Sequence, residues 1–360
     1  MCEVHFLAIY TPVFVGSAIA RYIDKIGNTT MSKRSMGMMK FQQGTAFVLA
    51  AVFGVDLLAG SPVVIAHRGA SGYCVEHSEA AKVLAHAQNA DYIEQDVVLT
   101  KDRVLIVSHD ITMEATTNVD EVFPMRRRED GKFYFADFTW SELQSVSLRP
   151  RMERFSGRVA PGPGVACGQK ILTLENEIKL LRSLDQALGR STGLYIELKG
   201  PSFYEKELGV KMGEVLLDEL KRLEVSTDPK DCLIQCFEEN ALIDLKNRLK
   251  CPYALILLMG GRGNEFDFQQ IASYAYGVGP SLQMLARQEA NKIVSTGFVE
   301  KAKAAGLKLH PYTVRRNSQP SWSPSLDETH RFLLDELKVD GFFTDYPDLG
   351  REAVDRMVKP

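Results

Sequence analysis

Acidic and imidazole side chains stand in or directly after short apolar runs of the sequence. They are His67, Glu94, Asp96, His109 and Glu197. Glu94 and Asp96 are two residues apart, so on a β-strand both carboxylates point to the same face. Three carboxylates brought together repel one another unless protons or a cation intervene, and an all-oxygen ligand set favours Ca2+ or Mg2+ over zinc. The set suits a divalent metal site with two histidines beside it for proton transfer.

Two basic residues accompany this set. Arg68 directly follows His67, and Lys199 lies two residues after Glu197. A guanidinium offers a planar group of N–H donors and an ammonium a compact charge, and both suit an anionic phosphate. Each residue alone is explained more simply by a core ion pair or a structural histidine. Together they are hard to explain as packing, because apolar side chains would close a core at a smaller desolvation cost.

From residue 62 onward, short apolar runs alternate with segments of helical periodicity, as in parallel α/β proteins. The run at 104–108 follows its predecessor after too few residues for a parallel crossover, so we expect an antiparallel hairpin return. Eight runs remain, and eight parallel strands close a (β/α)8 TIM barrel, whose functional residues gather at the carboxyl ends of the strands. The eight runs are 63–67, 92–98, 194–199, 233–237, 254–258, 276–280, 307–314 and 341–345.

A long segment separates the hairpin from the third barrel strand. About eighty residues are far more than one helix needs, so we expect residues 111–172 to form a small insertion over one barrel face, as a candidate substrate lid. Within it, Thr139 and Glu142 have the spacing of a capping box. Further on, Gly189 is placed to end a helix.

Residues 1–60 have the order of a leader followed by a secretory signal. Lys33 and Arg34 precede an apolar run at 46–55, and small residues follow that run. The run is about half as long as a membrane-spanning helix requires, so we expect export, to the periplasm, and no transmembrane anchor. The alternative is a buried helix of an intracellular protein. Residues 61–360 then form the barrel domain.

Composition excludes some partners and leaves others open. The 360 residues carry a formal net charge of −3, with charges of both signs interspersed, so no basic surface is expected to bind nucleic acid. The six cysteines show neither CxxC spacing nor a regular framework. We therefore expect buried thiols at Cys232 and Cys236, not a zinc site or a disulfide scaffold. The oligomeric state stays open.

Six short motifs follow one another along the chain: His67-Arg68-Gly69-Ala70-Ser71-Gly72, Glu94-Gln95-Asp96, Ser108-His109-Asp110, Ile196-Glu197-Leu198-Lys199, His310-Pro311-Tyr312-Thr313-Val314-Arg315 and Phe343-Thr344-Asp345-Tyr346-Pro347-Asp348. In this order they resemble the glycerophosphodiester phosphodiesterases, especially their periplasmic branch, and the resemblance spans residues 62–350. It implies a TIM barrel, a divalent metal, and hydrolysis of deacylated phospholipids such as glycerophosphocholine or glycerophosphoethanolamine to sn-glycerol 3-phosphate and an alcohol. By position, Glu94, Asp96 and Glu197 match the family's metal ligands, and His67 and His109 match its catalytic histidines.

The chain departs from the family pattern in two places. Ala115 stands where the family usually has the arginine of His-Asp-x-x-Leu-Asp-Arg, and Val75 stands where many members have proline. The sequence therefore does not say what holds the loop of His109. None of the five positions matched to ligands and catalytic histidines is altered.

The residues also support a mechanism. A phosphodiester is a poor electrophile because its anionic oxygens repel a nucleophile, so we expect the metal, Arg68 and Lys199 to neutralise that charge. His67 would deprotonate the nucleophile and His109 would protonate the departing alkoxide, or the two roles are exchanged. The nucleophile is either a glycerol hydroxyl, which gives a cyclic phosphate first, or water.

Two other functions fit part of the sequence. A phospholipase-type phosphodiesterase on the same barrel would expose aromatic residues around its mouth, and the insertion contains Phe133, Tyr134, Phe135 and Trp140. We expect Trp140 to pack beside the capped helix instead. A surface binding protein that retains the barrel is the second alternative, and the intact metal and histidine positions argue against a purely degenerate version.

Overall fold

The computed structural model describes residues 60–151, 168–261, 265–290 and 292–358. Within these ranges eight strands pair in parallel, in the order β10-β7-β6-β5-β4-β2-β1-β11, and curl into a nearly closed barrel. The predicted TIM barrel is confirmed. The strands are β1 (Val63–Ala66), β2 (Tyr92–Leu99), β4 (Gly193–Leu198), β5 (Cys232–Cys236), β6 (Ala254–Met259), β7 (Gly277–Pro280), β10 (Lys308–Leu309) and β11 (Gly341–Thr344).

Strands β10 and β11 end the strand order, and no strand ladder joins them among the described residues. A strand was expected over residues 307–314, but β10 has only two residues, so that length is wrong. The physical reason is Pro311, which has no N–H group to continue a ladder. Beyond it the chain still follows β11, because Phe343 N–H donates to Pro311 O at 2.9 Å and Val314 N–H donates to Phe343 O at 2.8 Å.

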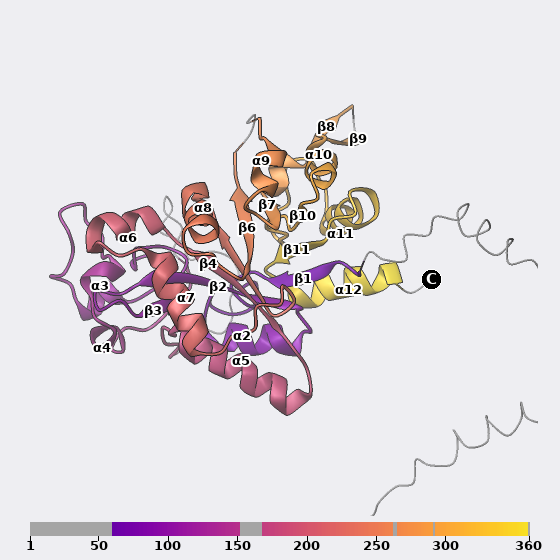
Figure 1. The fold of residues 1–360 in the computed structure, drawn as a ribbon. Coiled ribbons are helices and arrows are strands. Elements are labelled where there is room, and N and C mark those ends of the chain that lie inside the picture. The colour runs from indigo at the N-terminus through magenta and orange to yellow at the C-terminus, as the bar shows by residue number, and fades with distance from the viewer. Residues whose placement is uncertain (1–59, 152–167, 262–264, 291, 359–360) are drawn as a thin grey trace, which may run out of the picture. The chain divides into compact units, whose positions relative to one another are not determined.

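Two hairpins accompany the barrel. Strand β3 (Leu105–Val107) pairs antiparallel with β2, which confirms the predicted return at 104–108. Strands β8 (Ala286–Glu289) and β9 (Lys292–Ser295) form a second antiparallel hairpin that the sequence did not predict. Figure 1 shows this second hairpin projecting beyond α9 and α10.

Helices cover the outer side of the strands, and α12 lies alongside β1 (Figure 1). Helix α5 ends at Gly189, whose φ of 62° is the left-handed conformation predicted for a helix stop. Among the helices that the structure describes, none has the length and apolarity to cross a membrane. The helices are α2 (Glu79–Ala87), α5 (Leu174–Leu188), α6 (Pro201–Leu208), α7 (Met212–Arg222), α8 (Glu239–Asn247), α9 (Phe268–Ala272), α10 (Phe298–Ala304), α11 (Leu326–Arg331), α12 (Pro347–Val358) and the short turns η2 (Leu282–Met284) and η3 (Phe332–Glu336).

The described part of the segment after β3, up to residue 151, carries three short helices, α3 (Val119–Val122), η1 (Phe135–Asp137) and α4 (Trp140–Leu143). The capping box of Thr139 and Glu142 is present at the start of α4, as predicted. Phe133, Phe135 and Phe138 are fully buried, so these rings pack inside the protein. Residues 1–59 and 152–167 lie outside the described residues, so the leader, the export to the periplasm and the extent of the lid stay predictions.

The barrel interior has an apolar floor. Each floor residue comes from a different strand. Because side chains alternate along a strand, the side chain two positions after a floor residue also points into the barrel interior. On β1 and β2 this step leads from Ile65 to His67 and from Tyr92 to Glu94. The polar residues therefore lie one layer above the floor, toward the carboxyl ends. The floor consists of Ile65, Tyr92, Tyr195, Leu233, Ile256 and Phe343.

Candidate active site

A cavity of about 140 Å3 opens at the carboxyl ends of the strands. We call it the active-site cavity. Six of the seven predicted site residues line it, and Asp96 belongs to the carboxylate cluster at its base. Gln235, Phe237, Leu258, Tyr312 and Arg315 complete much of the wall. The six are His67, Arg68, Glu94, His109, Glu197 and Lys199.

Three carboxylates, those of Glu94, Asp96 and Glu197, each place an oxygen within 4.8 Å of the other two. All three side chains are buried. Burial and the two neighbouring carboxylates hold the pKa of Glu94 well above its usual value. Burial also raises the pKa of Glu197 to about 8, although Lys199 opposes it. Without a cation the cluster is thus neutralised partly by protons, and a divalent ion would supply the same compensation.

Neighbouring hydrogen-bond donors fix the orientation of the carboxylates in this cluster. Gln235 Nε2 donates to Glu94 Oε1 at 2.9 Å, and the Arg68 backbone N–H donates to Glu94 Oε2 at 2.9 Å. His77 Nε2 lies 2.8 Å from Asp96 Oδ2. The other oxygen, Asp96 Oδ1, is buried and has no hydrogen-bond partner among the described residues. A buried carboxylate oxygen left free inside an all-oxygen set fits a hard cation such as Ca2+ or Mg2+.

A strained turn brings the Arg68 N–H to this cluster. Arg68 has φ of 58° and Gly69 has φ of 84°, so two consecutive residues are left-handed. Gly69 is also required by space, because a Cβ there would lie 2.7 Å from the backbone carbon of Ala81. The left-handed conformation costs a non-glycine residue roughly 1–2 kcal/mol. Such strain is typical of functional sites, where surrounding contacts enforce the conformation.

A buried ion pair supports the cluster from behind. Lys82 on α2 and Glu177 on α5 are both fully buried, and their charged atoms are 2.7 Å apart. Lys82 Nζ also donates to the backbone carbonyl of Glu94. The pair therefore ties two outer helices to the strand that carries two of the three carboxylates.

The first histidine is held by an aspartate that the sequence analysis did not assign. His67 Nδ1 lies 2.6 Å from Asp345 Oδ1, and Arg315 Nε donates to Asp345 Oδ2 at 2.8 Å. Burial and the Arg68 charge lower the pKa of His67 to about 4, although Asp345 opposes them. With Nδ1 bound to a carboxylate, Nε2 is the nitrogen available for proton transfer, and it lies 4.0 Å from Glu94 Oε2.

The second histidine is held in the same way. His109 Nδ1 lies 3.0 Å from Asp110 Oδ1, and the side chain of His109 is 30% exposed, against 10% for His67. Burial and the nearby Arg68 charge lower the pKa of His109 to about 4. Both imidazoles are therefore neutral at neutral pH in the free protein, and each presents Nε2 for exchange.

An arginine outside the family motifs connects both halves of this site. Arg151 Nη1 donates to Asp110 Oδ2 at 2.6 Å, and Arg151 Nε donates to Glu76 Oε2 at 2.7 Å. Glu76 in turn accepts from Arg68 Nη1 at 3.0 Å. Arg151 thus holds the loop of His109, in a chain that has Ala115 in place of the family's usual arginine.

We expect Arg151→Met to lower kcat by about 10- to 100-fold, because small displacements of catalytic groups have effects of this size. Metal-dependent thermal stabilisation should be unchanged, since Arg151 contacts none of the three clustered carboxylates. Arg149→Met is the matched control, because Arg149 pairs with Asp120 and Glu121 instead. Equal kinetics for the two variants, measured as kcat and KM separately, would refute the role of Arg151.

The supporting residues differ in how visible they were in the sequence. Asp345 lies two positions after Phe343, so the alternation along β11 places it over the floor beside His67. Gln235 lies two positions after the floor residue Leu233 on β5, so the same alternation places it in the cavity wall. Arg151 and Lys82 have no such signal, because their partners are brought to them only by the tertiary fold.

Comparisons with known proteins agree with this geometry. Residues 67–349 match the model of the glycerophosphoryl diester phosphodiesterase family. A glycerophosphodiester phosphodiesterase of Haemophilus influenzae is 32% identical over 324 residues, covering 81% of this chain and 89% of the relative. One of Treponema pallidum is 32% identical over 326 residues, covering 81% of this chain and 91% of the relative.

Solved structures share the fold. A crystal structure of a glycerophosphoryl diester phosphodiesterase from Silicibacter pomeroyi superposes with a TM-score of 0.64 at 22% identity, covering 82% of this chain and 94% of that one. A phosphodiesterase of Oleispira antarctica, solved in complex with the product sn-glycerol-3-phosphate, superposes with a TM-score of 0.57 at 22% identity, covering 82% of this chain and 97% of that one.

Proposed function

The chain belongs to the glycerophosphoryl diester phosphodiesterase family, and from this premise we propose that it hydrolyses glycerophosphodiesters to sn-glycerol 3-phosphate and an alcohol. The observation that carries the proposal is the site itself. One small cavity joins a buried three-carboxylate cluster, two cationic side chains and two histidines that are each bound through Nδ1. Every part of this set has a task in cleaving an anionic diester.

The first task is to neutralise the phosphate. Arg68 and Lys199 line the cavity, and Lys199 Nζ donates to Glu197 Oε1 at 2.7 Å, so its charge lies beside the cluster. Glu94, Asp96 and Glu197 would hold a divalent cation, which we propose to be Ca2+ or Mg2+, and that ion would act as a Lewis acid toward a nonbridging phosphate oxygen. Arg68 keeps its guanidinium in place through Glu76.

The second task is to move two protons. We assign His67 as the base, since its neutral imidazole can accept a proton at Nε2 while Asp345 stabilises the resulting imidazolium. His109, which is neutral in the free protein, first takes up a proton at Nε2, favoured by the anionic substrate, and then donates it to the departing alkoxide. We assign the acid role to His109 because its side chain is the more exposed of the two and so lies nearer the mouth of the cavity, through which the alcohol leaves.

A coupled assay for sn-glycerol 3-phosphate tests the proposal. Purified protein should release this product from glycerophosphocholine and glycerophosphoethanolamine, lose activity with a chelator, and recover it on addition of Ca2+ or Mg2+. Phosphatidylcholine should not be cleaved, since of the aromatic rings expected at a phospholipase mouth Phe133 and Phe135 are buried. The other two are only partly exposed, because Tyr134 stacks on Phe203 and Trp140 packs against the core. Lack of turnover on every diester with either ion present would overturn the proposed hydrolysis and favour a binding protein.

A further inference from the structure

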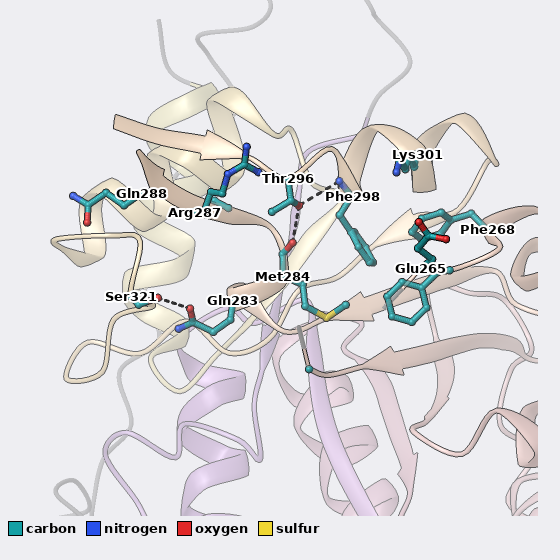
Figure 2. Close-up of a pocket in the computed structure, with 13 residues that line it drawn as sticks. Glu265, Phe268, Gln283, Met284, Arg287, Gln288, Thr296, Phe298, Lys301 and Ser321 are labelled. Carbon is teal, nitrogen blue, oxygen red and sulfur yellow. Dashed lines mark hydrogen bonds between the residues drawn. The ribbon is translucent and has the colours of Figure 1, made fainter. Parts of the chain in front are cut away.

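A second and larger cavity, of about 890 Å3, lies on the same face of the barrel as the active-site cavity. We call it the side cleft. Its residues come from the segments that follow β6, β7 and β10 and from the first turns of α9 and α10, all at the carboxyl ends of the strands. Figure 2 shows Phe298 and Met284 pointing into it, with Arg287 and Lys301 on opposite sides.

The side cleft and the active-site cavity share a wall. Tyr312 lines the active-site cavity, and its hydroxyl donates to Met259 O at 2.9 Å, two residues before Gly261 in the side cleft. The Leu282 N–H donates to the backbone carbonyl of Tyr312 at 2.9 Å, and the next residues, Gln283 and Met284, line the side cleft. The backbone around Tyr312 therefore separates the two cavities by about one layer of residues.

The size of the active-site cavity limits what it can hold. Its 140 Å3 is below the roughly 300–1,000 Å3 of ordinary small-molecule sites. A phosphate with its glycerol is small, but an alcohol longer than a few atoms must extend out of this cavity. The side cleft is the larger neighbouring space into which it can extend, and its volume is within the ordinary range.

The side cleft has an apolar surface of three phenylalanine rings and walls held by hydrogen bonds. Phe266, Phe268 and Phe298 contact one another edge to face or tilted, with centroids 5.0 to 6.1 Å apart. Thr296 Oγ1 donates to Met284 O at 2.7 Å and Ser321 Oγ donates to Gln283 Oε1 at 2.8 Å, so segments distant in sequence are joined across it (Figure 2). A preformed apolar surface of this kind binds apolar groups without a large ordering cost.

We propose that the side cleft binds the alcohol half of the diester and favours an alcohol with an extended apolar chain. The inference rests on the proposed function, because the glycerol phosphate half is taken to occupy the active-site cavity. The side cleft also carries the charged side chains of Glu265, Arg287 and Lys301, of which Arg287 is paired with Glu289 at 2.6 Å. Its apolar part, which an alkyl chain would contact, consists of Met284 and the three phenylalanine rings. The alcohol chain would extend from the mouth of the active-site cavity past Tyr312 and lie against Met284 and the three phenylalanine rings.

Two substrates that give the same product test this selectivity. The coupled assay measures sn-glycerol 3-phosphate from glycerophosphoethanolamine and from glycerophospho-n-octanol, the latter below its micellar concentration. We expect kcat/KM to be about tenfold higher for the octyl diester, which corresponds to partial burial of several methylene groups. Equal or lower kcat/KM for the octyl diester overturns the inference while leaving the hydrolysis intact. Hydrolysis of neither substrate overturns the proposed function, and the inference falls with it.

A polar substitution in the side cleft tests whether the preference for the octyl diester arises there. Met284→Gln keeps the side-chain length and should reduce the octyl preference about threefold, with kcat/KM for glycerophosphoethanolamine unchanged. The matched control is Met125→Gln, because Met125 is 91% exposed and does not line the side cleft. If Met284→Gln and Met125→Gln give the same ratio of kcat/KM between the two substrates, the octyl group does not bind in the side cleft. A circular dichroism melting curve shows whether each variant remains folded.

Discussion

Replacement of His109 by alanine is expected to lower kcat for glycerophosphocholine by about 100- to 10,000-fold, the usual loss when a general acid or base is removed. KM should change much less, because Arg68, Lys199 and the carboxylate cluster, which bind the phosphate in our proposal, remain in place. The side chain is partly exposed, so its truncation leaves the core intact. The coupled assay for sn-glycerol 3-phosphate gives both constants.

Two comparisons distinguish the loss of a catalytic group from the loss of metal binding. Metal-dependent thermal stabilisation should be the same in His109→Ala as in the unmodified protein, since His109 is not a proposed ligand. His67→Ala should lower kcat similarly, and the double variant should be little worse than either single one, because residues that act as a unit are strongly non-additive. Near-normal turnover of His109→Ala would remove this histidine from the catalytic pair.

Glu197→Gln is expected to weaken binding of Ca2+ or Mg2+ by about 100-fold, since even outer-sphere changes at metal sites cost about 10- to 100-fold in affinity. The substitution keeps the side-chain shape but removes one of the three carboxylate groups that converge on the site. It also leaves the Lys199 ammonium, now 2.7 Å from Glu197 Oε1, without its charged partner. Titration by calorimetry measures the affinity directly.

Thermal stability provides a second readout of the same change. At an ion concentration about 100 times Kd, binding stabilises the folded protein by about 2.7 kcal/mol, and a 100-fold weaker site at that concentration gives only about 0.4 kcal/mol. Glu207→Gln is the control, because Glu207 is a carboxylate that pairs with Arg128 and neither lines the active-site cavity nor belongs to the carboxylate cluster. An unchanged metal titration for Glu197→Gln would exclude this residue from the ligand set.

The site was predictable from the sequence to the extent that strand alternation controls it. Glu94 and Asp96 share a face because they lie two apart on β2, and Asp96 is directly paired in register with Glu197 on β4. The antiparallel return before His109 followed from a connection too short for any other geometry. The strand through residue 314 was overestimated because apolar periodicity was weighed above the missing N–H of Pro311.

Long-range partners could not be obtained in this way. Lys82 occurs in a helix with ordinary amphipathic spacing, and only the packing of α2 against α5 reveals that it is fully buried on Glu177. Arg151 likewise meets Asp110 across a sequence separation that no local pattern encodes. The β8–β9 hairpin was missed because half of its strand residues are exposed and polar, so it lacks the alternation of a half-buried strand.

The way in which both histidines are bound links product release to recovery of the enzyme. On the proposed roles, with water as the nucleophile, turnover leaves His67 protonated and His109 neutral, whereas the reaction of the next substrate requires the reverse. Because Asp345 and Asp110 occupy the two Nδ1 atoms, the imbalance can be corrected only through the Nε2 atoms. Both Nε2 atoms lie at the active-site cavity, which the product occupies until it leaves. A slowly leaving alcohol would therefore also delay the proton exchange that prepares both histidines for the next substrate.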